Sequence, residues 1–364
     1  MKIIRPTYLI NPETCKGNIR NMAVKAAQSG VIFRPHFKTH QSLVIGRWFR
    51  EAGVSRITVS SLTAAEFFAQ DGWDDITVAF PVNLPEIDLM NRLAGKIRLG
   101  LLVEHPPVVK TLATRLESPV DVYIKIDTGY HRTGLTLDEM PDITELASII
   151  RESPMMRLTG LLTHAGHTYH ASGPDEIVRI YHSAVQILNI VREKLGEQGR
   201  ELVLSYGDTP SCATLASFPG IDEIRPGCFV FYDLMQLFAG VCRPEQIGGI
   251  VVCPVVAVHE SRNQAVLYGG AIHFSKESLS TDHGPIYGQL VEMSNYRWHR
   301  PVSESFMVSL SQEHGILEAP PEVIRNLQPG ALVGIIPVHS CLTANLIRGY
   351  RFPDGEKADY FSGI

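Results

Sequence analysis

Five groups of residues with chemical potential follow short apolar runs in this sequence. Lys38 follows "GVIF" within "RPHFKTH", Arg132 lies in "KIDTGYHRTG", and His164 and Tyr169 lie in "LLTHAGHTYH". The segments "SYGDTPS" and "EIRPGC" supply glycines, small hydroxyl side chains, an arginine and a thiol. A lysine amine can form a Schiff base with an aldehyde, and the backbone N–H groups of glycine-rich and hydroxyl-rich loops can bind phosphate.

The elements that must position these groups are visible as short strand-like runs that alternate with helical patterns. The runs are "GVIFRPH", "SRITVSS", "DDITVAF", "KIRLGLLV", "VDVYIKIDT", "RLTGLLTHA", "ELVLSYGD" and "IDEIRPG". Apolar spacing predicts helices around Ile19–Ala27 and Ile177–Val191, and "TAAE", Thr63 to Glu66, is typical of a capping box that opens a third. Because parallel strands need helical crossovers, this alternation predicts an α/β fold, a (β/α)8 TIM barrel, with a doubly wound open sheet as the alternative.

The pattern changes past about residue 240. Strand-like runs such as "GGIVVCPVVAVHE" and "ALVGIIPVHSC" are joined there by Gly/Pro-rich or polar segments, which predicts a C-terminal all-β domain. We expect the barrel to cover residues 12–238 and the β domain to comprise residues 1–11 and 239–364. The polar segment from His273 to Pro285 is expected to be a surface loop, with a lid as the alternative.

A barrel would bring the five groups to one face, because chemistry in such barrels collects at the carboxyl ends of the strands. Each group alone also has an ordinary explanation: a surface ion pair for Arg132, a partly buried histidine for His164, a turn for Gly207. The loops after strands seven and eight are where these barrels often hold phosphate. A phosphate site with a strand-end lysine suggests pyridoxal phosphate, and an aldolase whose lysine binds a sugar phosphate directly is the alternative.

A second candidate site lies in "VHSCL", where one residue separates His339 from Cys341. In an extended strand both side chains would point to the same side. Imidazole and thiolate suit zinc, but two ligands leave a tetrahedral site incomplete, so water, substrate or another residue must fill it. Taken alone, the pair is more typical of a buried thiol beside an ordinary histidine.

The overall composition excludes several classes of function. The net charge is −5 and no Lys/Arg-rich run is present, so we expect no nucleic-acid partner. The N-terminus resembles no signal peptide, and no apolar stretch approaches the roughly 18 residues of a membrane span, so we expect a cytoplasmic protein without membrane association. Six cysteines without a CxxC pair predict free thiols.

Together these motifs resemble the D-threonine aldolase and D-serine dehydratase family, within the alanine-racemase-like (fold type III) pyridoxal-phosphate enzymes. The resemblance rests on "RPHFKTH", "DTGYHRTG", "THAG", "SYGDTPS", "RPG", "SQEHG" and "PVHSCLT". It covers nearly the whole chain, from Thr7 to Cys341. "YGGAIHFSKE" departs from the family, where a "DAG"-like strand end is usual.

The resemblance implies roles for individual residues. Lys38 would be the Schiff-base lysine, with Arg132 at the phenolic oxygen, His164 against the ring and Arg225 facing the ring nitrogen. The positions that bind phosphate or flank the ring would be Tyr169, Gly207, Thr209, Gly227 and Cys228. Members of the group carry a metal at His-x-Asp in the aldolases and at His-x-Cys in the dehydratases, so His339 and Cys341 favour dehydration with zinc or another divalent metal.

The implied activity is the dehydration of a D-β-hydroxy amino acid such as D-serine to a 2-oxo acid and ammonia, with Lys38 as the base for the α-proton. Cleavage to glycine and an aldehyde is the first alternative, and His167 or His170 would then be the base. An amino-acid racemase and a non-catalytic pyridoxal-phosphate carrier are the others. The fold group also implies a homodimer.

Overall fold

The protein is described by a computed structural model that covers residues 1–282, 284–361 and 363. The described chain divides into two compact units, one of residues 20–227 with residue 363 and one of residues 1–19 with residues 228–361. The domain limits expected from the sequence, 12–238 for the barrel and 1–11 with 239–364 for the β domain, stay a prediction.

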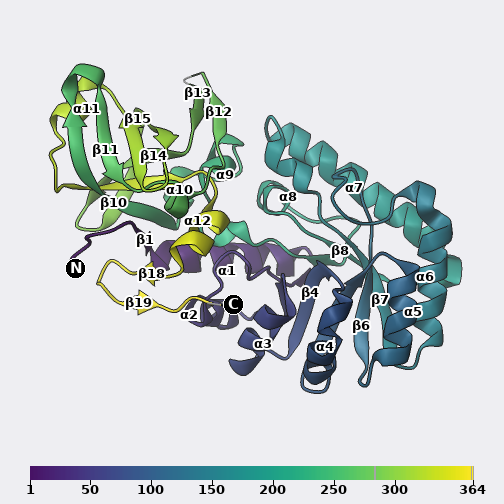
Figure 1. Ribbon diagram of the computed structural model, residues 1–364. Coiled ribbons are helices and arrows are strands. Elements are labelled where there is room, and N and C mark those ends of the chain that lie inside the picture. The colour runs from purple at the N-terminus through teal and green to yellow at the C-terminus, as the bar shows by residue number, and fades with distance from the viewer. Residues whose placement is uncertain (283, 362, 364) are drawn as a thin grey trace. The chain divides into compact units, whose positions relative to one another are not determined.

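The unit of residues 20–227 is a ring of eight parallel strands with helices outside it (Figure 1). Its strands pair in the order β2-β9-β8-β7-β6-β5-β4-β3, and a bridge between His36 and Thr58 joins the two ends. All eight predicted strands are present, and the predicted barrel is confirmed. The strands are β2 (Ile32–Phe33), β3 (Ile57–Val59), β4 (Asp75–Pro81), β5 (Arg98–Val103), β6 (Val120–Lys125), β7 (Met156–Thr163), β8 (Val203–Tyr206) and β9 (Glu223–Ile224).

Helices connect these strands and cover their outer faces. They are α1 (Pro12–Gln28), α2 (Leu43–Glu51), α3 (Leu62–Gln70), α4 (Ile87–Ala94), α5 (Pro106–Arg115), α6 (Met140–Glu152), α7 (Pro174–Lys194) and α8 (Thr209–Thr214). Because the strands are covered on both sides, β6 is buried along its whole length. The helices predicted around Ile19–Ala27 and Ile177–Val191 are confirmed as α1 and α7.

The capping box predicted from Thr63 to Glu66 is wrong. The cap of α3 is Ser61, whose Oγ accepts a hydrogen bond from the Ala64 N–H at 3.1 Å. Ser61 almost directly follows β3, so the helix begins two residues earlier than "TAAE" suggests, and Thr63 already lies inside it.

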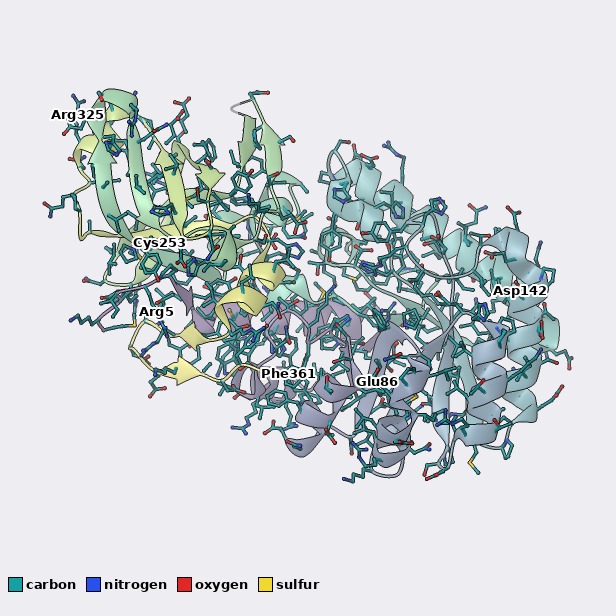
Figure 2. The ribbon with its side chains drawn as sticks, in the orientation of Figure 1. Arg5, Glu86, Asp142, Cys253, Arg325 and Phe361 are labelled. Atoms are coloured by element: carbon teal, nitrogen blue, oxygen red, sulfur yellow. The ribbon has the colours of Figure 1, made fainter. Side chains whose placement is uncertain are left out.

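The remaining unit is mainly an antiparallel β structure. Six strands close into a small barrel in the order β11-β16-β15-β14-β17-β10, because β10 also pairs with β11. The N-terminal strand β1 adds to β10, with Tyr8 opposite Val251. Cys253 lies on β10 and is buried (Figure 2). The predicted C-terminal β domain is therefore confirmed as a class of structure.

The longest strands of this unit, β10 and β15, belong to its six-stranded barrel. The strands are β1 (Thr7–Ile10), β10 (Gly249–His259), β11 (Gln264–Tyr268), β12 (Leu279–Thr281), β13 (Gly284–Ile286), β14 (Gly288–Ser294), β15 (Arg297–Leu310), β16 (His314–Glu318), β17 (Leu332–Pro337), β18 (Tyr350–Arg351) and β19 (Lys357–Ala358). The helices are α9 (Leu234–Phe238), α10 (Ala271–Phe274), α11 (Pro321–Arg325) and α12 (Ser340–Ile347). The expected loop over 273–285 contains the paired strands β12 and β13, and its residue 283 lies outside the described residues.

Within the described part of the chain, none of the helices combines the length and apolar character needed to cross a bilayer. All six cysteines are free thiols, as predicted.

A buried ion-pair network holds the amino ends of the barrel strands together. Arg34 donates to Glu223 on β9 at 2.7 Å and to Asp75 on β4 at 2.6 Å, and its side chain is 3% exposed. Glu223 also accepts from the Ser205 hydroxyl on β8 at 2.6 Å. Arg34 in "RPHFKTH" is therefore a structural residue of the barrel interior.

We expect Arg34→Met to lower the free energy of unfolding by about 3–5 kcal/mol, because it leaves the buried Glu223 carboxylate without its cation. Urea denaturation measures this change. The matched control is Arg47→Met, since the Arg47 side chain is 56% exposed in its pair with Asp71, and it should cost at most about 1 kcal/mol. Equal losses in the two variants would contradict the role given to Arg34.

Candidate functional site

Lys38 lies in the loop that follows β2, where its side chain is exposed. Its backbone N–H donates to Nδ1 of His36 at 3.3 Å, and His36 itself makes the bridge that joins the ends of the barrel sheet. The loop is therefore fixed by the pairing that closes the barrel, and the lysine stands at the carboxyl end of the first strand, as predicted.

Positive groups converge around Lys38. Burial and the nearby charges of Lys38, Arg225 and Arg132 lower the pKa of His36. Burial lowers the pKa of His164 as well, assisted by Lys38, Arg132 and Lys125. The charged groups that act on these two histidines are all basic, so this end of the barrel is complementary to an anion.

His164 is held in one orientation and one tautomer. Its Nδ1 donates to the Gly207 carbonyl oxygen at 2.5 Å, which requires a proton on Nδ1. Because its pKa is lowered, the ring is neutral at physiological pH and Nε2 carries the lone pair. His164 and Gly207 were predicted separately, after strands six and seven, and the structure joins them directly.

The predicted phosphate-type residues form one hydrogen-bonded chain. The Thr209 N–H donates to the Tyr169 hydroxyl at 3.2 Å, and the Thr209 hydroxyl accepts from the Gly227 N–H at 3.3 Å. A Cβ on Gly227 would come within 2.7 Å of the His36 carbonyl oxygen, so only glycine lets these loops approach so closely. The loops after strands one, six, seven and eight are thus tied together.

Arg225 is buried below these loops. Its Nε donates to the Ser205 hydroxyl at 2.7 Å, and its Nη2 donates to the carbonyl oxygens of Thr163 and, at 3.3 Å, Ser205. Ser205 in turn donates to Glu223, so Arg225 is positioned by the same network that holds Arg34. Burial lowers the pKa of Arg225 to about 10, but the guanidinium keeps its charge at neutral pH.

The loop that carries Arg132 is built on a single carboxylate. Oδ1 of Asp127 accepts the backbone N–H groups of Gly129, Tyr130 and His131 at 2.9–3.1 Å. The Arg132 guanidinium lies 5.1 Å from the centre of the Tyr130 ring. The sequence "DTGYHR" therefore encodes a turn that presents an arginine.

These residues fit pyridoxal phosphate, which carries a phosphate and a phenolate. The site has an accessible lysine, a surplus of positive charge and a loop structure that only glycine permits at Gly227. Lys125 also belongs here but was not predicted. It is buried at the end of β6, and burial, aided by Arg225, lowers its pKa to about 7.

The second candidate site lies in the other unit, and its local structure differs from the prediction. The extended strand expected at "VHSCL" is wrong. His339 is the residue immediately before α12 (Ser340–Ile347), and Cys341 lies in the first turn of that helix. The two side chains still lie close together, because both residues are at the amino end of the same helix.

A third residue completes the group. The metal-binding atoms of Cys228, His339 and Cys341 all lie within 4.8 Å of one another. The two sulfurs are 3.4 Å apart, and the Cys228 thiol is also 3.3 Å from Oδ2 of Asp233. Cys228 was predicted at the cofactor, and that role stays a prediction, but its thiol lies with the metal pair.

The surroundings of the group also fit a metal. Nδ1 of His339 lies 2.6 Å from Oε2 of Glu277, and a carboxylate on the far ring nitrogen is the usual support of a metal-binding histidine. Burial lowers the pKa of His339, but hydrogen bonds to Cys341 and Glu277 outweigh it and raise the pKa to about 11. In the described part of the chain the buried Tyr8 hydroxyl, whose pKa is raised by burial and by Asp233 and Cys228, has no hydrogen-bond partner.

Glu277 and Asp233 were missed from the sequence. Glu277 lies 62 positions before His339, in the segment that departs from the family pattern, and no local spacing connects the two. Asp233 follows Cys228 by five positions in "CFVFYD". This spacing is visible in the sequence, but nothing in the sequence connects Asp233 with the metal pair.

We expect the stability of the cofactor-free protein to depend on pH through Lys125. The pKa of this amine is about 7 in the folded protein and 10.5 ordinarily. Between these values the unfolded chain holds a proton that the folded chain lacks, so the free energy of unfolding should rise with pH, by an amount on the order of a few kcal/mol.

Lys125→Met should flatten this rise, as measured by urea denaturation at several pH values across the window. The control is Lys110→Met, because the Lys110 side chain is 60% exposed in its pair with Glu145. If the profiles of the wild type and Lys125→Met run parallel, the amine is not a buried neutral group.

Comparison with known proteins follows the two units. Residues 10–234 match the family described as alanine racemase, N-terminal domain, and residues 249–352 match the putative serine dehydratase domain. The chain is 29% identical to D-serine dehydratase of Dictyostelium discoideum, covering 95% of this chain and 92% of that protein. It is also 29% identical to D-threo-3-hydroxyaspartate dehydratase of Delftia sp. (strain HT23), covering 96% and 92%.

Solved structures agree with these matches. The structure of D-threo-3-hydroxyaspartate dehydratase from Delftia sp. HT23 superposes with a TM-score of 0.89 at 26% identity, covering 99% of this chain and 98% of that one. D-threonine aldolase from Filomicrobium marinum, at 20% identity and a TM-score of 0.83, shares the fold. The family matches and these relatives confirm the predicted resemblance: the chain belongs to the family of the alanine racemase N-terminal domain, and over nearly its whole length it is similar to D-serine dehydratase and D-threo-3-hydroxyaspartate dehydratase.

Proposed function

We propose that this protein is a pyridoxal-phosphate-dependent and metal-dependent lyase that dehydrates a D-β-hydroxy amino acid such as D-serine, giving a 2-oxo acid and ammonia. The observation that carries the proposal is the group of Cys228, His339 and Cys341, in a chain that also presents Lys38 among basic side chains. The names of two relatives, D-serine dehydratase and D-threo-3-hydroxyaspartate dehydratase, support the same reaction class.

The cofactor would be held by the residues at the carboxyl end of the barrel strands. When bound, pyridoxal phosphate supplies an electron-withdrawing ring that stabilises negative charge at the substrate α-carbon. Lys38 would bind its aldehyde, Arg132 its phenolic oxygen, and Arg225 would face the ring nitrogen from below. The phosphate and the ring edge would be contacted by Tyr169, His164, Gly207, Thr209, Gly227 and the backbone of Cys228.

The chain's own groups then have distinct tasks. Lys38 takes the proton from the substrate α-carbon, and the other side chains around the cofactor transfer no proton. His164 stays neutral and fixed by Gly207, so it packs against the ring without competing for that proton. Arg225 remains charged at neutral pH, so it does not give up a proton to the ring nitrogen.

The metal would be zinc, held by His339 and Cys341. It supplies a Lewis acid for the hydroxyl that leaves the β-carbon. Glu277 orients His339 through Nδ1, which leaves Nε2 for the metal. A thiolate in place of an aspartate favours zinc over magnesium, because soft ligands select such metals.

One observation favours a second candidate, cleavage to glycine and an aldehyde. His167 stacks beside Tyr130, with ring centres 6.2 Å apart, and its buried Nδ1 makes no hydrogen bond within the described residues. In that reaction His167 would be the base for the substrate β-hydroxyl. The relative named D-threonine aldolase matches over a smaller part of the chain, at 23% identity over 64% of this chain and 62% of that protein.

The assembly and the location belong to the same proposal. The fold group supports a homodimer, and six free thiols support a reducing compartment, the cytoplasm.

Lys38→Ala should lose the visible absorption of lysine-bound pyridoxal phosphate and lower kcat by about 10²–10⁴-fold, because it removes both the Schiff-base amine and the base. An absorption spectrum of the purified protein after addition of cofactor measures the first effect. Lys110→Ala, on the outer helix α5, should keep the wild-type spectrum. A wild-type protein that takes up no cofactor would refute the cofactor assignment.

A product assay tests the reaction itself. With D-serine, D-threonine and D-3-hydroxyaspartate, we expect a 2-oxo acid and ammonia in equal amounts. A chelator should abolish this turnover while leaving the cofactor spectrum intact, and added zinc should restore it, because the metal acts on the leaving hydroxyl and not on cofactor binding.

Glycine with an aldehyde would instead establish the aldolase reaction, and His167→Asn should then impair it. Turnover that resists the chelator, in a protein without metal by elemental analysis, would overturn the metal assignment.

A further inference from the structure

We propose that Cys228 is a third protein ligand of the metal, so that this chain builds a Cys-His-Cys site with one open position. The inference rests on the proposed metal site and deepens it, because the sequence pattern assigns only His339 and Cys341. Cys228 comes from a distant part of the chain, where "RPGC" places a thiol directly after the last barrel strand.

The distances suit shared coordination. Zinc–sulfur bonds of about 2.3 Å at a tetrahedral angle place two sulfurs about 3.8 Å apart. The sulfurs of Cys228 and Cys341 are 3.4 Å apart, so a shift of a few tenths of an ångström would seat both on one ion. The imidazole of His339 lies within the same 4.8 Å limit.

One carboxylate, that of Asp233, contacts the segments of both thiols. Asp233 accepts from the Ser340 N–H at 2.9 Å and from the Ser340 hydroxyl at 3.0 Å, immediately before Cys341. The same oxygen, Oδ2, lies 3.3 Å from the Cys228 sulfur. Asp233 is completely buried, so it fixes the start of α12 against the segment of Cys228 before any ion binds.

Two independent features point to a ligand at this place. Glu277 supports the histidine from outside, as an outer carboxylate does in metal sites. The Tyr8 hydroxyl is fully buried beside Asp233 and the two thiols, with no partner in the described part of the protein. Water on a bound metal ion would donate a hydrogen bond to that hydroxyl.

The third ligand would change the chemistry of the site. Three protein ligands and one open position are the arrangement of catalytic zinc, and the open position would receive the substrate hydroxyl. Binding releases the thiol protons, so two thiolates neutralise the ion, whereas one thiolate leaves a net positive charge. The site should therefore bind zinc or cobalt tightly and reject magnesium and manganese.

Cobalt substitution of the cofactor-loaded protein tests the ligand set without reference to turnover. Sulfur-to-cobalt charge transfer in the near ultraviolet grows with the number of thiolates. We expect the wild type to show the intensity of two thiolates with a tetrahedral visible spectrum. Cys228→Ser and Cys341→Ser should each lose about half of it, in proportion to the thiolates removed.

Zinc affinity, measured by competition with a chromophoric chelator, gives a second readout. Cys228→Ser should weaken zinc binding by more than the roughly 10–100-fold that loss of an outer partner costs, and Glu277→Gln provides that reference. Cys242→Ser, which removes a buried thiol outside the group, should leave both measurements unchanged. Circular dichroism and retained cofactor absorption show that each variant is folded.

The outcomes separate the two proposals. If Cys228→Ser keeps the full charge-transfer intensity and affinity while Cys341→Ser loses them, the third ligand is refuted and the metal pair stands. If the two-thiolate spectrum is present but no 2-oxo acid forms from any D-β-hydroxy amino acid, the ligand set stands and the proposed function fails.

Discussion

Mutual repulsion among basic side chains is the constraint on which the barrel unit depends. The charges of Lys38 and Arg132 act on His36 and His164 at the carboxyl ends of the strands, and burial makes a charge on either histidine more costly. The lowered pKa values keep both histidines neutral, and hydrogen bonds from backbone N–H groups hold the loops together. Binding of a phosphate-bearing cofactor would place negative charge among these basic side chains and reduce the repulsion between them.

Acidic side chains position other groups in both units, as Asp127 does for the loop that carries Arg132. Glu223 and Asp75 neutralise Arg34 at the amino ends of the strands, and Ser205 relays the network from Glu223 to Arg225. In the other unit Asp233 and Glu277 take different tasks, since one fixes the backbone before Cys341 and the other orients His339. The carboxylates therefore position other residues, and the basic and metal-binding side chains that they position would contact the ligand.

The sequence predicted the barrel because the pattern is local: eight short strands alternate with helices, and the side chains that follow the strands lie on one face of the barrel. It placed Lys38, Arg132 and His164 correctly at the strand ends for the same reason. It failed where contacts join distant segments. Cys228 and Glu277 reach His339 only through tertiary folding. The backbone at Cys341 is helical because α12 begins at Ser340, and no local pattern in the sequence predicted that helix.

The place of strand β1 sets an order of events during synthesis. Tyr8 precedes the entire barrel in the chain, yet its neighbour in the sheet, Val251, follows the barrel. The barrel strands from β2 to β9 can pair while the ribosome still holds the rest, because domains fold as units as they emerge. The group of Cys228, His339 and Cys341 is complete only when α12 has been made, after the whole barrel. A newly made chain would therefore gain its cofactor pocket before it could capture a metal ion.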